Sequence, residues 1–373
     1  MNIALVILHA DPMRGGAERY TIDLAAALAR REHHVSLVAT HFADPPAGVK
    51  LVELPARGFT RAARYRRMLD SLDLHLRQTP YHIVHAMFPV RQCHVYHPHA
   101  GMAAAAVAGR PLQTLLNPRR RAMARIEHRL LNSPHPPVVL CLSDYVKQSV
   151  LQHYPSLPPS RLATLFNAVD LDLFDPDVQH GGQKLRAARG IGPNDVLALI
   201  VAQDFVRKGV PQAIAATRQL NARRAPGQPP LKLLVVGSGR HHPDADDPNI
   251  IFVGADRKIA RYYGAADFFV LPTRHDPCSL VVLEALAMGL PVISTRFNGA
   301  CEIMTDGIHG FVLSDPDDLA ALSQAMYKLL DPHLRARMSD ACRQLRPKLS
   351  FEHHVDRLLQ IYQSCRVESD NRG

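Results

Sequence analysis

The sequence predicts an α/β protein made of two doubly wound domains with parallel sheets, and three observations support this. Short apolar runs alternate with segments of helical spacing along most of the chain, a pattern typical of parallel sheets with helices on both faces. The chain has 373 residues, which is too many for one ordinary hydrophobic core. A stretch rich in Pro, Gly and polar residues follows residue 170 and divides the alternation into two series.

The first series, residues 1–170, predicts an amino-terminal Rossmann-like domain. Residues 2–8 are a continuous apolar run, as in a strand that is buried on both faces. Apolar residues recur at helical spacing from Ala17 onward, and Ser143 is a good N-cap for a helix over residues 145–153. Further strands are expected at residues 35–39, 51–54, 83–86, 95–97, 138–142 and 162–166.

The second series, residues 171–350, repeats the alternation and predicts a second Rossmann-like domain. Strands are expected at residues 196–202, 231–236, 250–253, 268–271 and 292–294. Helices are expected at residues 210–221, 259–263, 280–288, 317–330 and 333–346. The chain ends with a helical pattern over residues 351–365, which makes the segment 351–373 a candidate for completing the first domain.

The composition excludes several classes of protein. With 47% hydrophobic and 21% charged residues, the chain is typical of a globular protein and not of a disordered segment or a coiled coil. Trp is absent and aromatic residues are few, which argues against stacking on nucleic-acid bases. The six cysteines include no closely spaced zinc or redox pair, which favours a reducing, cytoplasmic location. Neither a membrane span nor a signal peptide is expected, because long apolar runs and an initial basic region are missing.

The positive charge is concentrated in the first half of the chain. The net charge is +10. Residues 1–170 contain 20 Lys and Arg residues against 11 Asp and Glu, whereas residues 171–373 contain 24 against 23. Because a one-sided basic field attracts anionic partners, we expect the first domain to face an anionic surface or an anionic acceptor.

Two loops that follow predicted strands carry residues suited to phosphate binding, and ligands of open α/β sheets bind at such loops. Gly15 and Gly16 follow the first strand, where glycines let backbone N–H groups approach a phosphate or a sugar; a simple strand-to-helix turn is the alternative. Arg207 and Lys208 follow the strand at residues 196–202. Adjacent cations suit a diphosphate, although a solvated surface pair is an equally simple interpretation.

Two carboxylates lie at the start of the helix predicted after residues 268–271. Asp276 precedes this helix and Glu284 lies within it, among apolar neighbours. A carboxylate in such a position needs a partner, and ribose hydroxyls would serve. The amides of Ser279 and Leu280 fall at the helix start, which favours an anion. The alternative is a capping Asp and an exposed Glu.

His97 and His99 follow a short predicted strand. A histidine at a strand end can act as a general base or orient a sugar hydroxyl. A metal site shared with His94 is disfavoured, because no carboxylate is close in sequence. Since the chain has 21 histidines, ordinary packing remains an alternative for both residues.

The basic segment Arg119, Arg120, Arg121, Arg125 and Arg129 predicts an amphipathic surface helix. Arg121, Arg125 and Arg129 share one helical face, and apolar residues are interleaved with them. Such a helix suits an anionic membrane surface or an anionic acceptor. A solvated basic face is the alternative.

In this order, the motifs resemble glycosyltransferase family 4, the retaining enzymes of the GT-B fold, over nearly the whole chain. The most specific match is the pattern Leu283-Glu284-Ala285 followed by Gly289-Leu290-Pro291-Val292. Other matching segments are Gly15-Gly16-Ala17-Glu18, Asn167-Ala168-Val169-Asp170 with Phe174, Arg207-Lys208, and the strand and turn Leu233-Leu234-Val235-Val236-Gly237-Ser238-Gly239. Two positions depart from the family pattern, since Asp276 replaces a Glu and Ala168 replaces a Gly. Within the family, the chain is similar to lipopolysaccharide-core glucosyltransferases.

The resemblance implies two Rossmann-like domains that face a central cleft and a retaining transfer of a hexose. The donor would be a nucleotide-diphosphate sugar, with UDP-glucose as the leading candidate. The acceptor would be a hydroxyl of a glycan or glycolipid such as lipopolysaccharide core. The family implies a cytoplasmic enzyme, with peripheral contact to the inner membrane as a further expectation. There are two competing interpretations. One is a nucleotide-sugar epimerase of the same fold, and the other is a non-enzymatic protein that binds polyanions or nucleic acid. Because a glycosyltransferase is the primary interpretation, no nucleic-acid partner is expected.

The resemblance also assigns roles to residues. Arg207 and Lys208 would bind the donor diphosphate, so that no metal or other cofactor is required. Glu284 would hold the ribose, and Asp276 with the neighbouring amides would orient the donor sugar. From the first domain, His97 or His99 would contact the sugar or the acceptor.

Overall fold

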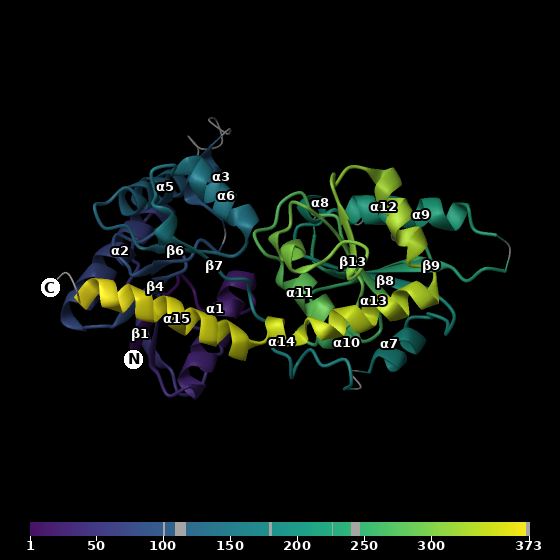
Figure 1. The fold of residues 1–373 in the computed structure, drawn as a ribbon, viewed down its shortest axis with the longest axis horizontal. Coiled ribbons are helices and arrows are strands. Elements are labelled where there is room, and N and C mark those ends of the chain that lie inside the picture. Colours follow the sequence, from purple (N-terminus) through teal and green to yellow (C-terminus); the bar gives the residue numbers. More distant parts are fainter. Residues whose placement is uncertain (100, 109–116, 179–180, 226, 240–246, 371–373) are drawn as a thin grey trace. The chain divides into compact units, whose positions relative to one another are not determined.

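The computed structural model describes residues 1–99, 101–108, 117–178, 181–225, 227–239 and 247–370, and these form two compact units (Figure 1). Unit 1 comprises Met1–Asn167 together with Phe351–Gly373, and unit 2 comprises Ala168–Ser350. Each unit contains its own parallel sheet with helices around it. The predicted fold class, two doubly wound α/β domains, is confirmed.

The sheet of unit 1 has seven parallel strands in the order β3-β2-β1-β4-β5-β6-β7. The strand order reverses between β1 and β4. Doubly wound folds bind their ligands beside such a reversal. The strands are β1 (Asn2–Val6), β2 (His34–Ala39), β3 (Lys50–Glu53), β4 (Ile83–Ala86), β5 (Val95–Tyr96), β6 (Val138–Cys141) and β7 (Leu162–Thr164). The described helices are α1 (Gly16–Arg30), α2 (Arg61–Gln78), α3 (Ala103–Val107), α5 (Pro118–Leu131), α6 (Asp144–His153), the 3-10 helix η1 (Pro159–Arg161) and α15 (Phe351–Asp370).

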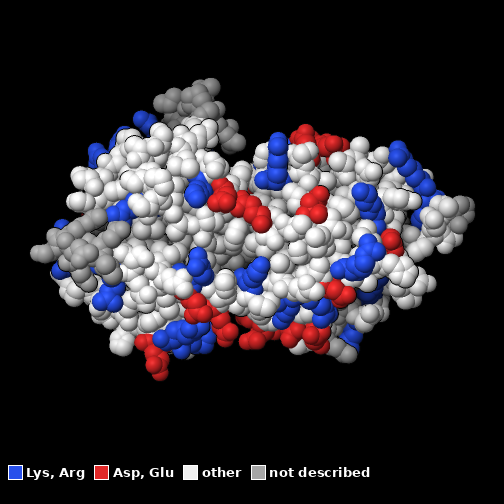
Figure 2. Space-filling view, in the orientation of Figure 1, with Lys and Arg blue, Asp and Glu red and all other residues white. Residues whose placement is uncertain are grey.

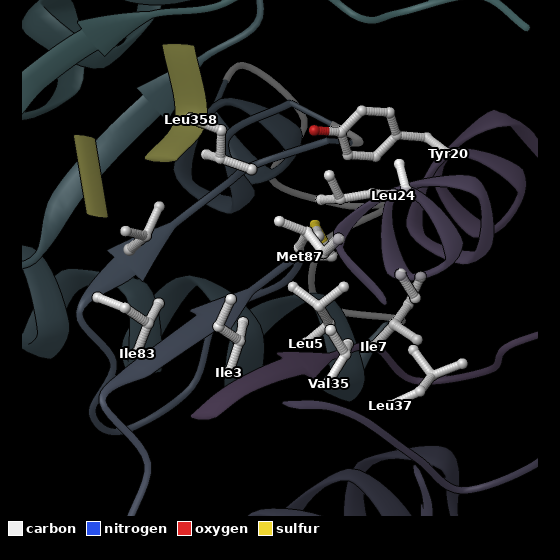
Figure 3. Packing of buried hydrophobic residues seen from close by; sticks show 14 of the residues in the cluster. Ile3, Leu5, Ile7, Tyr20, Leu24, Val35, Leu37, Ile83, Met87 and Leu358 are labelled. Atoms are coloured by element: carbon white, nitrogen blue, oxygen red, sulfur yellow. The ribbon is translucent and has the colours of Figure 1, made fainter. Parts of the chain in front are cut away.

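Alternate residues of a strand point to opposite sides of the sheet. In unit 1 both sides are apolar, and helices cover both of them. Ile3 and Leu5 of β1 pack beneath Leu24 of α1 and Leu358 of α15 (Figure 3). The intervening Ala4 belongs to the cluster on the other face, which α2 and α5 cover. The carboxy-terminal helix α15 therefore supplies part of the core of unit 1, beside α1 and β4.

Unit 2 repeats this plan with six parallel strands in the order β10-β9-β8-β11-β12-β13. Here the order reverses between β8 and β11. The strands are β8 (Val196–Ala202), β9 (Leu231–Gly237), β10 (Ile250–Val253), β11 (Phe268–Leu271), β12 (Val292–Thr295) and β13 (Gly310–Leu313). The described helices are α7 (Gly182–Ala188), α8 (Phe205–Lys208), α9 (Val210–Ala222), α10 (Ala260–Tyr263), α11 (Leu280–Ala287), η2 (Gly299–Ile303), α12 (Leu319–Lys328), α13 (Pro332–Gln344) and α14 (Arg346–Leu349).

Each strand expected from the sequence is present, but several elements lie outside those expectations; these are α2, α3, α7, α8, α14, η1, η2 and β13. The arginines of α2 hide its helical pattern, since its buried side chains are spaced among exposed cations. Gly310 opens β13 with φ of 138°, and a Cβ there would lie 1.9 Å from the carbonyl oxygen of Val292. Glycine is therefore required by close packing of the strands, although it weakens the strand signal in the sequence.

A buried carboxylate holds several elements of unit 1 together. Glu127 of α5 has no exposed surface. It accepts hydrogen bonds from the hydroxyls of Tyr96 (2.5 Å) and Tyr154 (3.1 Å) and from the backbone amides of Ala103 and Ala104 (2.8 Å each). These partners come from β5, from the end of α6 and from α3, so one side chain fixes four elements.

We expect Glu127→Ala to destabilise unit 1, because it leaves buried hydroxyls and amides without an acceptor. The expected loss in the free energy of unfolding is about 3 kcal/mol or more. The measurement is urea unfolding followed by far-UV circular dichroism, since the chain has no Trp. Glu53→Ala, at an exposed position of the same unit, is the control. Equal unfolding midpoints for the two variants would contradict the structural role of Glu127.

Candidate active site

The loops after β8 and β11 meet at the carboxyl edge of the unit 2 sheet, where the strand order reverses. Lys208, the last residue of α8, forms an ion pair with Asp276, in the loop before α11. Only 13% of the Lys208 side chain and 10% of the Asp276 side chain are exposed. Buried charges are stable only when they are paired. The structure therefore brings together two of the residues predicted to bind the donor, and it joins them directly.

Arg207 ties the same two loops together. Its Nη1 donates a 2.7 Å hydrogen bond to the carbonyl of His275. Its own carbonyl accepts from the amide of Arg274 at 2.9 Å and from the hydroxyl of Thr273 at 3.1 Å. The Arg207 side chain remains 40% exposed, so Arg207 lies at this edge with Lys208 and can still reach a ligand. A guanidinium and an ammonium side by side suit a diphosphate.

The short helix α8 is fixed at both ends, which sets the positions of its two cations. Asp204 is the N-cap, and its side chain accepts from the amide of Arg207 at 3.2 Å. Gly209 ends the helix with φ of 77°, in the left-handed region. A Cβ at Gly209 would lie 2.3 Å from the carbonyl oxygen of Pro272, so only glycine lets α8 approach the β11 loop.

Glu284 has a tyrosine partner that the sequence analysis missed. The hydroxyl of Tyr263, on α10, donates a 2.7 Å hydrogen bond to Glu284 on α11. Burial raises the pKa of Tyr263 well above its ordinary value, and the neighbouring Glu284 charge raises it further. Tyr263 therefore stays protonated and holds the carboxylate in place. Nothing in the local sequence pairs these residues, which are 21 positions apart.

The start of α11 contains an amide that is bonded within the chain. The amide of Ser279 already donates to the side chain of Asn298 at 3.2 Å, and its role in donor binding stays a prediction. Asn298 also caps η2 by accepting from Ala300. Leu280 is the first residue of α11, where an amide has no preceding helical carbonyl as partner. The hydroxyl oxygen of Ser279 is buried without a hydrogen-bond partner in the described chain.

The Gly15–Gly16 loop follows β1 at the edge of the unit 1 sheet. Gly15 is the N-cap of α1 in an extended conformation, with φ of 169°, which any residue adopts. A Cβ at Gly15 would meet only the flexible carboxylate of Glu18, at 3.1 Å. The backbone conformation thus gives no reason for glycine at this position. The role of this loop in donor binding stays a prediction.

His97 and His99 lie inside unit 1, in a cluster of aromatic and imidazole rings. Their ring centroids are 4.4 Å apart, and the Tyr20 ring lies 4.4 Å from that of His99. Burial lowers the pKa of His99 to about 3 and that of His97 well below its ordinary value, with neighbouring histidines lowering both further. Both rings are therefore neutral near pH 7. Each Nε2 atom is buried without a hydrogen-bond partner among the described residues.

The residues that surround the two histidines were not identified from the sequence. His354 of α15 bonds the carbonyl of Phe166 through Nδ1 (2.8 Å) and the hydroxyl of Tyr20 through Nε2 (2.7 Å). Tyr20 reads as an ordinary apolar residue of an amphipathic helix, and His354 lies in the final helix, far along the chain. No local motif signals either contact.

The basic segment forms α5, and its apolar face is occupied. Met123 and Ile126 pack against the core beneath α2, and Leu130 and Leu131 are buried. The amphipathic helix is present as predicted, but its apolar face packs against the core, and a contact of its arginines with an anionic surface stays a prediction. Exposed cations remain on the outer side of α5; these are Arg120, Arg121, Arg125 and Arg129. On the face shown in Figure 2, basic side chains occur beside acidic ones, so the excess positive charge is not one uniform field there.

Arg119 is the half-buried member of the segment, in the first turn of α5. Burial lowers the pKa of Arg119, and Arg61, Arg14 and Arg64 lower it further. The first turns of α2 and α5 contain no acidic residue. Cations at helix N-termini oppose the helix dipole, so this like-charged arrangement is a candidate site for an anionic group.

No group of three or more His, Cys, Asp or Glu side chains that could hold a metal ion occurs in the described part of the chain. Among the described helices, none combines the length and the apolar character needed to cross a bilayer.

Two family models match the chain. Residues 14–173 match Glycosyltransferase Family 4, and residues 196–332 match Glycosyl transferases group 1. The D-inositol 3-phosphate glycosyltransferase of Thermobifida fusca (strain YX) is 27% identical, over 98% of this chain and 93% of the relative. The lipopolysaccharide glucosyltransferase WaaG of Escherichia coli (strain K12) is 24% identical, over 85% of this chain and 86% of the relative.

Solved structures share the architecture. The crystal structure of WaaG, a glycosyltransferase involved in lipopolysaccharide biosynthesis, superposes with a TM-score of 0.78 at 24% identity, over 92% of this chain and 95% of that chain. The structure of Anabaena Alr3699/HepE in complex with UDP-glucose gives a TM-score of 0.68 at 17% identity and covers both chains fully. With its first half in Glycosyltransferase Family 4 and its second half in Glycosyl transferases group 1, the chain belongs to the GT-B glycosyltransferases and is a hexosyltransferase.

Proposed function

We propose that the protein transfers a hexose, with retention of configuration, from a nucleotide-diphosphate sugar to a hydroxyl of a glycan or glycolipid. The observation that carries this proposal is the buried Lys208–Asp276 pair beside Arg207, where the strand order of unit 2 reverses. Two cations suit the diphosphate, and a carboxylate beside them suits sugar hydroxyls. We take UDP-glucose as the donor, the ligand named for HepE, and lipopolysaccharide core as the acceptor class, as named for WaaG.

The ion pair prepares Lys208 for an anionic ligand. An ammonium group has three donors, and Asp276 takes one of them. The remaining donors and the exposed side of Arg207 bind the phosphate oxygens. As the nucleoside diphosphate leaves, negative charge develops on these oxygens, and fixed cations stabilise that charge without reorganisation. We therefore propose that no divalent metal is needed.

Glu284 binds the ribose in this proposal. Carboxylate oxygens accept hydrogen bonds from vicinal hydroxyls. The hydrogen bond from Tyr263 fixes the orientation of the carboxylate, so less conformational freedom is lost when the ribose binds. Asp276 and the first amides of α11 orient the donor sugar.

The transfer step forms one bond and breaks one. The acceptor hydroxyl oxygen bonds to the anomeric carbon of the hexose while the bond from that carbon to the diphosphate oxygen breaks on the same face. The hydroxyl proton moves to the leaving phosphate oxygen. His97 or His99, whose Nε2 atoms have no hydrogen-bond partner in the described chain, contacts a hydroxyl of the sugar or of the acceptor.

The acceptor carries an anionic group that binds the arginines at the first turns of α2 and α5. A bound anion would offset the mutual repulsion of Arg119 with Arg61, Arg14 and Arg64. Any contact of α5 with an anionic membrane on the cytoplasmic side is then electrostatic, through its exposed arginines, because its apolar face is buried.

The proposed reaction is tested with a panel of UDP-, GDP- and ADP-sugars, with lipopolysaccharide core as the acceptor, in the presence of EDTA. We expect release of one nucleotide, UDP, at a rate that added Mg²⁺ changes less than about twofold, because protein cations supply the charge compensation. Loss of turnover in EDTA would contradict metal independence. Conversion of the donor sugar to an epimer, without transfer, would instead indicate an epimerase.

Lys208→Met is expected to lower kcat/KM by about 10²–10³-fold, since it removes a cation that acts on the leaving group. The measurement is steady-state UDP release together with UDP affinity by calorimetry. Arg274→Ala is the control, because Arg274 is a cation on the neighbouring loop between β11 and α11 but pairs with Asp317. A similar loss in both variants would mean that loop structure, and not the Lys208 charge, sets the rate.

Glu284→Ala is expected to abolish discrimination between UDP and 2′- or 3′-deoxy UDP, because the ribose hydroxyls lose their acceptor. In the wild type, we expect the preferred hydroxyl to contribute about tenfold or more in affinity. Calorimetric titration of the nucleotides into both proteins measures this. If the variant retains the wild-type preference, another residue binds the ribose.

A further inference from the structure

A chain of three buried rings connects α15 to the loop after β5. Nδ1 of His85 lies 2.7 Å from the hydroxyl of Tyr362, and Nε2 of His85 lies 3.2 Å from Nδ1 of His97. None of the three side chains has exposed surface. Tyr362 comes from α15 and His85 from β4, so the carboxy-terminal helix reaches His97 through one intermediate residue.

The direction of the first hydrogen bond follows from the surroundings of Tyr362. Within the described chain, the only hydrogen-bond partner of its hydroxyl is Nδ1 of His85. A buried O–H group needs an acceptor, so Tyr362 donates its proton and Nδ1 of His85 accepts. The opposite direction would leave two buried groups without a partner in the described chain, the hydroxyl proton of Tyr362 and the Nε2 lone pair of His97, whereas this direction leaves only the Nε2 atom of His97.

The second hydrogen bond is then determined as well. Burial lowers the pKa of His85 to about 3, so its ring is neutral near pH 7 and carries one proton. Because Nδ1 accepts, that proton is on Nε2, which donates to Nδ1 of His97. Burial also keeps His97 neutral, and its own proton must therefore be on Nε2.

The Nε2–H group of His97 is consequently a donor with no hydrogen-bond partner in the described part of the chain. We propose that Tyr362 is a positioning residue that acts through His85 and fixes His97 as the Nε2–H tautomer, so that His97 presents a hydrogen-bond donor to an oxygen of the bound sugar or acceptor. The identity of that ligand rests on the proposed function; the tautomer does not.

A second tyrosine–histidine pair in the same cluster provides a matched control. Nδ1 of His354 must donate to the carbonyl of Phe166, so its Nε2 accepts from the hydroxyl of Tyr20. Tyr20 is 1% exposed, and its ring lies 5.5 Å from that of His97. The hydrogen bond of its hydroxyl to His354 does not involve Tyr362, His85 or His97, so we expect its removal to leave the tautomer of His97 unchanged.

The tautomer is measured by long-range ¹H–¹⁵N correlation spectra of protein labelled with ¹⁵N-histidine, with His97 assigned from the missing signals of His97→Gln. In the ligand-free wild type we expect His97 to be protonated at Nε2 only. In Tyr362→Phe we expect the Nδ1–H tautomer of His97 to become detectable, and in Tyr20→Phe we expect no change. A wild-type His97 protonated at Nδ1 overturns the proposal, and so does an unchanged His97 in a folded Tyr362→Phe. The wild-type spectrum is decisive by itself if the variant does not fold.

A double-mutant cycle separates positioning from general structure. Tyr362→Phe is expected to lower kcat/KM with UDP-glucose about tenfold. In His97→Gln, the side-chain amide carries donor hydrogens at the position of Nε2 and does not depend on the hydrogen bonds from Tyr362 and His85. Adding Tyr362→Phe to His97→Gln should therefore change kcat/KM less than about twofold. An equal loss in both backgrounds overturns the relay. The spectra use no turnover, so failure of the proposed function and failure of the relay remain distinguishable.

Discussion

The buried ion pair between Lys208 and Asp276 is the interaction on which the unit 2 site depends. Withdrawing two charges from water costs free energy that only good pairing offsets. The pair can form because β8 and β11 are neighbours whose loops leave the same edge of the sheet. Gly209 fixes one partner, and backbone hydrogen bonds from Asp276 to Phe297 (2.9 Å) and from Gly299 to Asp276 (3.0 Å) fix the other. The sheet, and not the ligand, therefore sets the geometry.

The cluster of histidine and tyrosine rings in unit 1 is stabilised differently, since its buried rings are neutral. Burial disfavours the imidazolium form of His85, His99 and His354, so their hydrogen bonds depend on where a single proton is located. Tyr20 and Tyr362 satisfy two of the rings. A network of this kind favours one arrangement of the core. The polar atoms without a partner in the described chain, Nε2 of His97 and of His99, mark where a ligand could supply the missing hydrogen bonds.

The sequence predicted the strands and the loops that carry the site, because buried parallel strands are continuous apolar runs and ligands bind at their carboxyl ends. It could not predict the side-chain partners. His85 and Tyr362 are 277 residues apart, and no local pattern encodes such a pair. The periodicity of α5 identified an apolar face correctly, but periodicity does not say what covers a face. In the structure the core covers it, which changes how the arginines of α5 can act.

The return of α15 to unit 1 affects the order in which the protein can fold during synthesis. Unit 2 is one continuous segment, whereas unit 1 needs both Met1–Asn167 and the residues from Phe351 onward. Leu358 and Tyr362 have no exposed surface in its core. The ribosome therefore releases the last part of unit 1 only after all of unit 2 has been made. Unit 1 therefore begins before unit 2 and is completed after it, and its α1 face stays open to solvent and chaperones until α15 has been made.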